Sequence, residues 1–218
     1  MKRHPTNPNL HLHTDDYFHG FRVYTERGPL IQEYLERCEQ VIHASLHHYA
    51  RVTAFRLDLH LPPLYCLQDE SHANAVLERF FASLNAKIGH NRAQASQIRT
   101  GVHQTTVRYI WTREFGTEGT PHFHVTILVN GDAFTYLGDY DLGRDNMFNR
   151  VVQAWASALN ASCEEIVTLV HCPEGLVYRL RRDDQQSYNE LFYRVSYCCK
   201  ADTKQYQDRG HAFGYSRH

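Results

Sequence analysis

Two strand-like runs joined by a short glycine-rich turn constrain the fold of this chain more than any other feature. The first run, TTVRYIWTREF, covers residues 105–115, and the second, PHFHVTILV, covers residues 121–129. Both runs are rich in the β-branched and aromatic residues that favour strands, and the turn GTEGT between them supplies glycine. We therefore predict an antiparallel hairpin over residues 105–129.

Helical and extended patterns alternate along the rest of the chain. Apolar residues recur with helical spacing over residues 28–49, 72–88, 145–159 and 187–200. The alternation in RVTAFRLDLHLPP predicts a strand that begins at residue 51, and GLVYRL is a second strand candidate. Helices interspersed with a hairpin-containing sheet predict the α+β class, with a mainly antiparallel central sheet and flanking helices.

Length and composition indicate one soluble domain. The chain has 218 residues, of which 42% are hydrophobic, and this is enough for one buried core. We expect residues 1–27, which begin with a stretch rich in His, Asn and Pro, to be poorly ordered, and residues 28–218 to form a single domain. No apolar run approaches membrane-spanning length and the polar N-terminus lacks a signal peptide, so we expect a cytoplasmic protein without a membrane partner. The six cysteines form no C-x-x-C pair, which argues against a zinc ribbon.

The charge of the chain does not by itself indicate a nucleic-acid partner. The net charge is −1 at pH 7, close to neutral. Basic residues nevertheless cluster locally, as in YRLRR at residues 178–182. Any nucleic-acid interface must therefore be local.

The second strand of the predicted hairpin carries a pair of histidines. Residues two apart in a strand point to the same face, so His122 and His124 share one face while Phe123 and Val125 share the other. Two neighbouring imidazoles suit a divalent metal, and the hairpin would return Glu114 beside them as a third ligand. In a chain with 16 histidines, however, such a pair also arises by chance.

A second group of reactive residues lies in YRVSYCCK, residues 193–200. Tyr193 and Tyr197 are four residues apart, so they are neighbours on the surface of a helix, and Lys200 follows near the same stripe. A phenol can attack a phosphate and form a covalent ester, and a lysine beside it would offset the developing charge. The alternative is that the two tyrosines are partly buried packing residues.

The combination of these two groups resembles the HUH endonucleases, the initiators of rolling-circle replication. TREFGTEGTPHFHVTILV is similar to their metal motif, in which two histidines flank a bulky apolar residue, and RVTAFRLDLHLP looks like their first motif. The resemblance implies that Glu114, His122 and His124 hold a divalent metal, Mg²⁺ or Mn²⁺. It also implies an HUH-type sheet of RRM-like or ferredoxin-like arrangement.

The tyrosine motif Y-x-x-x-Y-x-x-K is similar to that of the two-tyrosine initiators of single-stranded phages. This likeness implies that Tyr193 and Tyr197 are nucleophiles and that Lys200 is their partner. Those initiators often carry a lysine directly before the second tyrosine, where this chain has Ser196. We therefore expect Tyr197 to be the main nucleophile and Tyr193 to be secondary.

The C-terminal sequences LFYRVSYCCKADTKQY and HAFGYSR resemble inovirus-type replication proteins and their prophage relatives of the YagK/YfjJ group, over roughly residues 30–217. The resemblance implies a bacterial enzyme that nicks and joins single-stranded or hairpin origin DNA through a 5′-phosphotyrosine link. Such a reaction would initiate replication of a filamentous phage, a prophage or a plasmid. The chain lacks the G-x-x-x-x-G-K-[ST] motif, so unwinding and synthesis would need a host helicase and a host polymerase.

We expect local arginines to hold the DNA strand, together with exposed aromatic residues. The candidates for DNA binding are Arg56, Arg113, Arg179, Arg181 and Arg182.

Two other functions fit parts of the sequence. His103-Gln-Thr105 and His124-Val-Thr126 are both His-x-Thr motifs, which act as acid and base in metal-independent phosphoesterases. A non-catalytic DNA-binding regulator is the other alternative. Sensitivity to chelators and a covalent protein–DNA adduct would separate these alternatives from the endonuclease.

Overall fold

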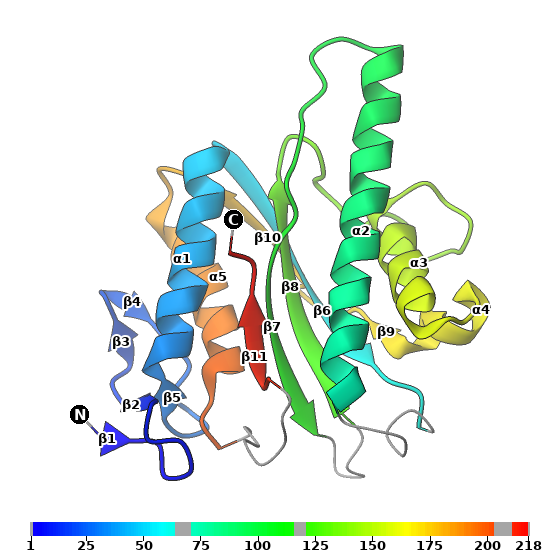
Figure 1. Ribbon diagram of the computed structural model, residues 1–218. Helices are drawn as coiled ribbons and strands as arrows, with labels where there is room; N and C mark the ends of the chain where they lie inside the picture. Colours follow the sequence, from blue (N-terminus) through cyan, green and yellow to red (C-terminus); the bar gives the residue numbers. More distant parts are fainter. Residues whose placement is uncertain (1, 64–70, 116–120, 203–210, 218) are drawn as a thin grey trace.

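The computed structural model describes residues 2–63, 71–115, 121–202 and 211–217. An antiparallel sheet forms its centre (Figure 1). The strand order is β10-β6-β8-β7-β11, and β9 pairs with β6 beside β10. The bounds of these strands are β6 (Arg51–His60), β7 (Arg108–Phe115), β8 (Pro121–Asn130), β9 (Val170–His171), β10 (Val177–Arg181) and β11 (Phe213–Tyr215).

The predicted hairpin is confirmed. β7 and β8 pair antiparallel, with Arg108 opposite Leu128 and Glu114 opposite His122. The other edge of β8 pairs with β6, so β8 is the middle strand of the sheet. The turn of the hairpin, residues 116–120, lies outside the described residues.

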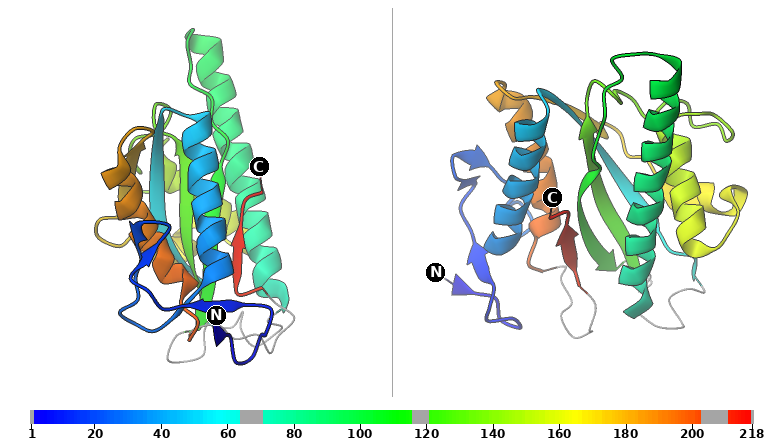
Figure 2. Two further views of the ribbon diagram at one scale, coloured as in Figure 1. Left: turned by 90° about the vertical axis from the view of Figure 1, so that its left-hand side faces the viewer. Right: turned by 45° about the horizontal axis from the view of Figure 1, so that its top comes forward.

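Helices cover both faces of the sheet, as Figures 1 and 2 show. One face packs against α1 (Gln32–His48) and α5 (Gln185–Ser196) through apolar side chains such as Ala54 and Leu128. The other face packs against α2 (Ser71–Ile98) and α3 (Met147–Leu159) through side chains such as Leu57 and Val125. Each central strand therefore contributes alternate residues to two cores, because successive side chains point to opposite faces. The predicted α+β class is confirmed.

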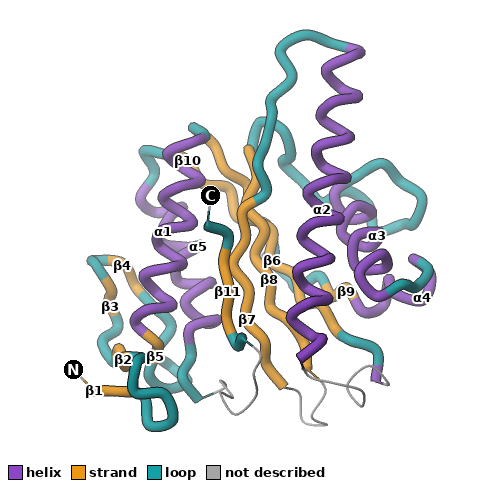
Figure 3. The backbone as a smooth tube through the Cα atoms, viewed as in Figure 1, coloured by secondary structure: helices purple, strands orange, loops and turns teal. Residues whose placement is uncertain are grey.

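Side-chain hydrogen bonds cap the first turns of two helices. The side chain of Asn146 accepts a hydrogen bond from the N–H of Asn149 at the start of α3, and Asp184 plays the same part before α5. A short helix, α4 (Cys163–Ile166), precedes β9 in the chain, and both are labelled in Figure 3. A 3₁₀ turn at Val167–Leu169 lies between them. None of the helices in the described ranges is long and apolar enough to cross a membrane.

The N-terminal region forms structure of its own. Its strands are β1 (Lys2–Arg3), β2 (His11–His13), β3 (Tyr17–Phe18), β4 (Phe21–Arg22) and β5 (Leu30–Ile31). β1, β2 and β5 form a small sheet, and β3 pairs with β4. The expectation that residues 1–27 are poorly ordered is wrong for residues 2–27, because Phe18 and Val23 are buried against α1 and α5.

Candidate functional site

The pairing of three central strands brings five polar side chains to one face of the sheet. His124 on β8 lies opposite Asp58 on β6, and His122 lies between His60 on β6 and Glu114 on β7. Directly opposite residues of an antiparallel pair share a face. Helices α1 and α5 cover this face. The tyrosine motif lies on α5 and on the turn that follows it.

Glu114, His122 and His124 form a triad suited to a metal ion. One nitrogen or oxygen ligand atom from each of the three residues lies within 4.8 Å of the others. Glu114 and His124 are 7% and 8% exposed, whereas His122 is only partly buried and leaves the triad open on one side. Burial lowers the pKa of His122, which favours the neutral form that binds metal. Two imidazoles and one carboxylate suit a divalent cation.

Asp58 orients His124. Its Oδ1 lies 2.6 Å from Nδ1 of His124, while Nε2 of the same ring lies 3.3 Å from Oε2 of Glu114. Nη2 of Arg56 lies 3.0 Å from the same Asp58 oxygen. A carboxylate that accepts a hydrogen bond from one ring nitrogen leaves the other nitrogen free for a metal.

The charges at this cluster shift two pKa values in opposite directions. Burial alone would raise the pKa of Asp58, but the hydrogen bond with His124 and the charges of His124 and Arg56 hold it below its ordinary value. Burial alone would lower the pKa of His124, but its hydrogen bonds to Asp58 and Glu114 raise it. A metal ligand must be a deprotonated nitrogen, so a cation that binds Nε2 of His124 would compete with a proton.

Tyr197 and Lys200 lie beside the triad. The ring centroid of Tyr197 is 5.7 Å from that of His124. Nζ of Lys200 is 3.6 Å from the centre of the Tyr197 ring and 3.4 Å from Oε1 of Glu114. Lys200 is 3% exposed, so its ammonium group lies inside the protein. There it contacts both the Glu114 carboxylate and the Tyr197 ring.

The helix that carries the tyrosines is shorter than the sequence predicted. α5 ends at Ser196, and Tyr197–Cys199 form a 3₁₀ turn. Tyr193 therefore lies on the helix and Tyr197 on the turn after it. The prediction of one helix through residue 200 is wrong, because the backbone changes from α-helix to a 3₁₀ turn after Ser196 and Lys200 forms a β-bridge with Leu30.

Tyr193 contacts the N-terminal region. Its hydroxyl donates a hydrogen bond to Oε1 of Glu26 at 3.1 Å, and the guanidinium of Arg22 lies 5.1 Å from the centre of its ring. Burial and the hydrogen bond to the Glu26 carboxylate raise the pKa of Tyr193. The two tyrosines therefore have different environments, one at the triad and one beside a carboxylate.

The five candidate arginines divide into two groups. Arg56 and Arg113 are 8% and 2% exposed, so the expectation that they belong to an accessible DNA-binding surface is wrong. Arg56 instead pairs with Asp58, which in turn holds His124. The exposed group consists of Arg179 and Arg181 on β10 and Arg182 directly after it.

Arg179 adds an aromatic partner to this exposed group. Its guanidinium lies 4.7 Å from the ring centre of Tyr136, a residue that is 67% exposed. A cation beside an exposed ring is a combination that binds single-stranded nucleic acid.

The two His-x-Thr motifs lie far apart. Oγ of Thr105 accepts a hydrogen bond from the N–H of Asn130, at the last residue of β8. His124 lies six residues earlier on that strand, which corresponds to about 20 Å. The motifs therefore do not face each other across one cleft, as the metal-independent phosphoesterase would require.

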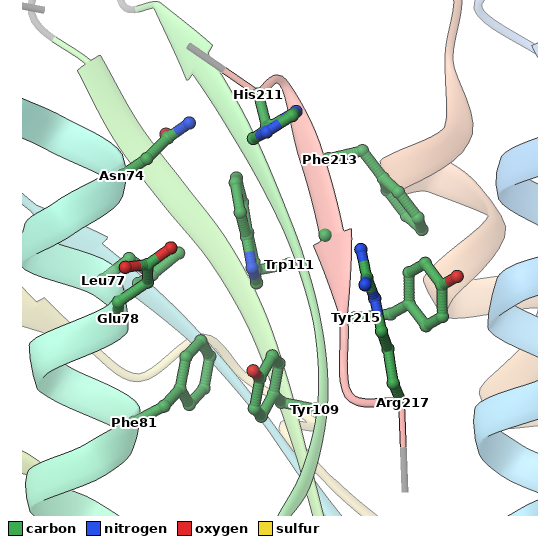
Figure 4. A pocket seen from close by; sticks show the side chains of 11 residues that line it. Asn74, Leu77, Glu78, Phe81, Tyr109, Trp111, His211, Phe213, Tyr215 and Arg217 are labelled. Carbon is green, nitrogen blue, oxygen red and sulfur yellow. The ribbon is translucent and has the colours of Figure 1, made fainter. Parts of the chain in front are cut away.

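The sheet also has a cavity on its opposite face. It has a volume of about 330 Å³ and lies between α2, β7 and β11, with Phe81, Tyr109 and Trp111 in its wall (Figure 4). Trp111 points away from the face that carries Glu114, because the two are an odd number of residues apart on β7. This cavity is therefore separate from the triad.

Sequence reasoning missed Asp58, Tyr24 and Glu26 as residues of the site, and it assigned Arg56 to DNA binding and not to the support of Asp58. The alternation in RVTAFRLDLHLPP does place Arg56 and Asp58 on one face of a strand. It contains no signal for the pairing register with β8, which is what sets Asp58 opposite His124. Nothing in the sequence indicates that residues 24 and 26 lie beside α5.

Comparison with known proteins places the chain in a family. A family model described as the YagK/YfjJ C-terminal domain matches residues 13–216. The YfjJ protein of Escherichia coli strain K12 is 32% identical over 206 residues, which cover 88% of this chain and 98% of that protein. The YagK protein of the same organism is 31% identical over 198 residues, which cover 87% of this chain and 95% of that protein. No solved structure matches. The chain therefore belongs to the YagK/YfjJ C-terminal domain family.

Proposed function

We propose that this protein is a metal-dependent HUH-type endonuclease that nicks and rejoins single-stranded DNA through a 5′-phosphotyrosine link. The observation that carries the proposal is the contact of Tyr197 with the triad. Its ring lies against His124, and the Lys200 ammonium group lies between that ring and Glu114. A nucleophile, a cation and a metal-binding triad in contact are the components that phosphoryl transfer requires.

The proposed reaction follows from the positions of these side chains. A divalent cation held by Glu114, His122 and His124, Mg²⁺ or Mn²⁺, would supply Lewis-acid chemistry to a DNA phosphate. The phenol oxygen of Tyr197 loses its proton and attacks the phosphorus atom. The bond from phosphorus to the 3′ oxygen breaks, and that oxygen takes up a proton. The products are a 5′-phosphotyrosine and a free 3′-hydroxyl group.

Rejoining is the reverse transfer. A 3′-hydroxyl group attacks the phosphotyrosine, a new phosphodiester forms, and Tyr197 leaves as a phenol. The Lys200 ammonium group stabilises the negative charge on the phenol oxygen in both directions. Asp58 fixes the orientation of His124 throughout, and Arg56 holds Asp58 in place.

The surroundings of the two tyrosines support different roles. Tyr197 is the nucleophile of the first cleavage, because it is the one in contact with His124. Tyr193 is held by a carboxylate, and a raised pKa disfavours its phenolate. It would act in a second cleavage, after the DNA or the segment around Tyr24 has moved.

The proposed partner is a single-stranded or hairpin origin DNA in a bacterial cytoplasm. Arg179, Arg181 and Arg182 would bind its backbone. The reaction would initiate rolling-circle replication of a phage, prophage or plasmid. A host helicase and a host polymerase would supply unwinding and synthesis, since the sequence has no P-loop motif.

The test is the formation of a covalent adduct. The protein is incubated in Mn²⁺ with labelled single-stranded oligonucleotides that tile the DNA flanking its own gene, and the products are separated on a denaturing gel. We expect an adduct that chelation abolishes, that Tyr197→Phe reduces more than Tyr193→Phe, and that the double variant lacks. The matched control is Tyr140→Phe, an exposed tyrosine that packs on Phe148 of α3, on the opposite face of the sheet from the triad.

Two results would contradict the proposal. An undiminished adduct in the double variant would remove the tyrosine assignment. A shifted band on a native gel, without any covalent adduct at any oligonucleotide, would favour a non-catalytic DNA-binding regulator.

A further inference from the structure

A segment of the N-terminal region is built into the tyrosine site. We call residues 21–30, which run from β4 to β5, the N-terminal strap. The strap follows α5 and the turn after it: the N–H of Arg22 donates to Oδ1 of Asn189 at 2.9 Å, and the N–H of Ala201 donates to the carbonyl oxygen of Pro29 at 2.9 Å. Figure 1 shows β4 and β5 at the two ends of the strap.

Gly28 shows how closely the strap approaches the end of the tyrosine segment. It adopts φ of +95°, and a Cβ atom at this position would lie 2.8 Å from Oδ2 of Asp202. The positive φ therefore favours glycine, and the short distance to the Asp202 side chain shows how near the two segments lie. The strap is a fitted part of the site and not a loose tail.

Ser196 is the central attachment point of the strap. It is fully buried and lies directly before Tyr197 in the chain. Its Oγ donates a hydrogen bond to the carbonyl oxygen of Tyr193 at 2.7 Å and accepts one from the N–H of Tyr24 at 2.8 Å. A lysine cannot accept a hydrogen bond, so it could not replace Ser196 in this contact.

The ring of Tyr24 touches both candidate nucleophiles. Its centroid lies 5.7 Å from that of Tyr193, at an interplanar angle of 67°, and 5.4 Å from that of Tyr197, at 62°. Both are edge-to-face contacts, the favourable geometry for aromatic pairs. Tyr197 also contacts His124, whereas the strap holds Tyr193 through Glu26.

We propose that Tyr24 is a positioning residue that assigns the two tyrosines their order of use. Its ring keeps Tyr197 against His124 for the first cleavage and keeps Tyr193 with Glu26. This inference rests on the proposed function, because it concerns the nucleophiles of that reaction. Misplacement of a reacting group by about 1 Å can cost on the order of a hundredfold in rate, so a loose Tyr197 ring would react much more slowly.

The experiment measures adduct formation through each tyrosine separately. The Tyr193→Phe background reports Tyr197, and the Tyr197→Phe background reports Tyr193. We expect Tyr24→Ala to slow the Tyr197 adduct at least about tenfold, with unchanged affinity for the oligonucleotide, and to slow the Tyr193 adduct much less. Tyr24→Phe keeps the ring and should retain the Tyr197 rate within about twofold. The matched control is Tyr17→Ala, an exposed tyrosine earlier in the N-terminal region.

A second variant guards against loss of folding. Ser196→Ala removes the anchor of the strap but leaves the Tyr24 ring in the chain, and it should reduce the Tyr197 adduct in the same direction. Thermal unfolding of each variant shows which of them is folded. An unchanged Tyr197 rate in a folded Tyr24→Ala protein would overturn the inference. An equal loss in Tyr24→Phe would also overturn it, because the hydroxyl and not the ring would then matter.

A spectroscopic measurement separates this inference from the proposed function. In protein labelled with ¹³C-tyrosine, the ring signals of Tyr197 are identified by their absence in Tyr197→Phe. We expect these signals to shift in Tyr24→Ala and to stay in place in Tyr24→Phe. Unshifted signals in Tyr24→Ala would overturn the positioning role, whether or not the protein nicks DNA. A shift without any adduct in wild type would instead count against the proposed function alone.

Discussion

The carboxylate of Asp58 lies 2.6 Å from Nδ1 of His124, and the opposite nitrogen of the same ring faces Glu114 at 3.3 Å. This relationship gives the two nitrogens of His124 different tasks. Nδ1 holds the ring in position, and Nε2 is directed toward the other members of the triad. The hydrogen bond with His124, together with the charges of His124 and Arg56, holds the pKa of that carboxylate below its ordinary value, which favours its role as an acceptor.

The first prediction concerns metal affinity. Asp58→Asn keeps the shape of the side chain and removes its charge, so the ring of His124 should be held less firmly. We expect Mn²⁺ binding, measured by isothermal titration calorimetry, to weaken about tenfold to a hundredfold, while His124→Ala should abolish it. The matched control is Asp132→Asn, a carboxylate paired with Arg51 away from the triad. Equal affinity of Asp58→Asn and wild type would show that Asp58 does not orient the ligand.

The second prediction concerns the ionisation of Tyr193. Burial and the Glu26 carboxylate raise its pKa, because the phenolate would form beside a negative charge. Glu26→Gln should therefore lower the pKa of Tyr193, as measured by the ultraviolet absorbance of the phenolate with Tyr193→Phe as the reference. The control is Glu190→Gln, an exposed carboxylate on α5 that pairs with Gln186.

The sign of the linked stability effect follows from the raised pKa. A group whose pKa is higher in the folded protein stabilises it below the unfolded value, which is about 10 for tyrosine. That contribution is lost as the pH rises through the pKa of the folded protein. The difference in unfolding free energy between wild type and Glu26→Gln should therefore change only in alkaline solution. An identical Tyr193 titration in the two proteins would contradict the contact with Glu26.

The third prediction concerns DNA binding by the exposed arginines. Arg179→Ala should weaken binding of a single-stranded oligonucleotide. It should also reduce the magnitude of the slope of log K against log salt by about 0.7, because a protein with one phosphate contact fewer releases fewer counterions on binding. Fluorescence anisotropy over a series of salt concentrations measures both quantities. Arg144→Ala is the control, since Arg144 is an exposed arginine paired with Asp141 in another part of the molecule. Slopes that stay unchanged in both Arg179→Ala and Arg181→Ala would exclude this edge of the sheet as the DNA contact.

Much of the fold was predictable because its main elements have strong local patterns. The alternation in β6 and β8 and the helical spacing in α1 and α3 are properties of consecutive residues. β9 and β11 were missed, because strands of two and three residues are too short to show a period. They form only through pairing with distant strands, as Phe213 does with Thr112.

The candidate site was predictable only where its geometry is local. A period of two is enough to place His122 and His124 on one face. The partners that orient the site come from elsewhere in the chain: Asp58 lies 66 positions from His124, and Tyr24 lies 172 positions from Ser196. Charge alone likewise could not separate buried Arg56 from exposed Arg179, because burial depends on what packs over each strand.

The last prediction tests the strand that closes the sheet beside β7. A Cβ atom at Gly214 on β11 would lie 2.5 Å from Cε2 and Nε1 of Trp111, whose indole is 9% exposed and packs against Phe123. The added methyl group would force the indole toward the cavity that it lines, so Gly214→Ala should lower the free energy of unfolding by about 1–3 kcal/mol, the usual cost of overpacking. Gly89→Ala is the matched control, because Gly89 lies within α2 and its added Cβ would meet nothing within 4 Å. That substitution should raise the free energy of unfolding by up to about 1 kcal/mol through helix propensity. Urea unfolding of the three proteins measures both changes, and a Gly214→Ala protein as stable as wild type would show that β11 does not pack tightly on Trp111.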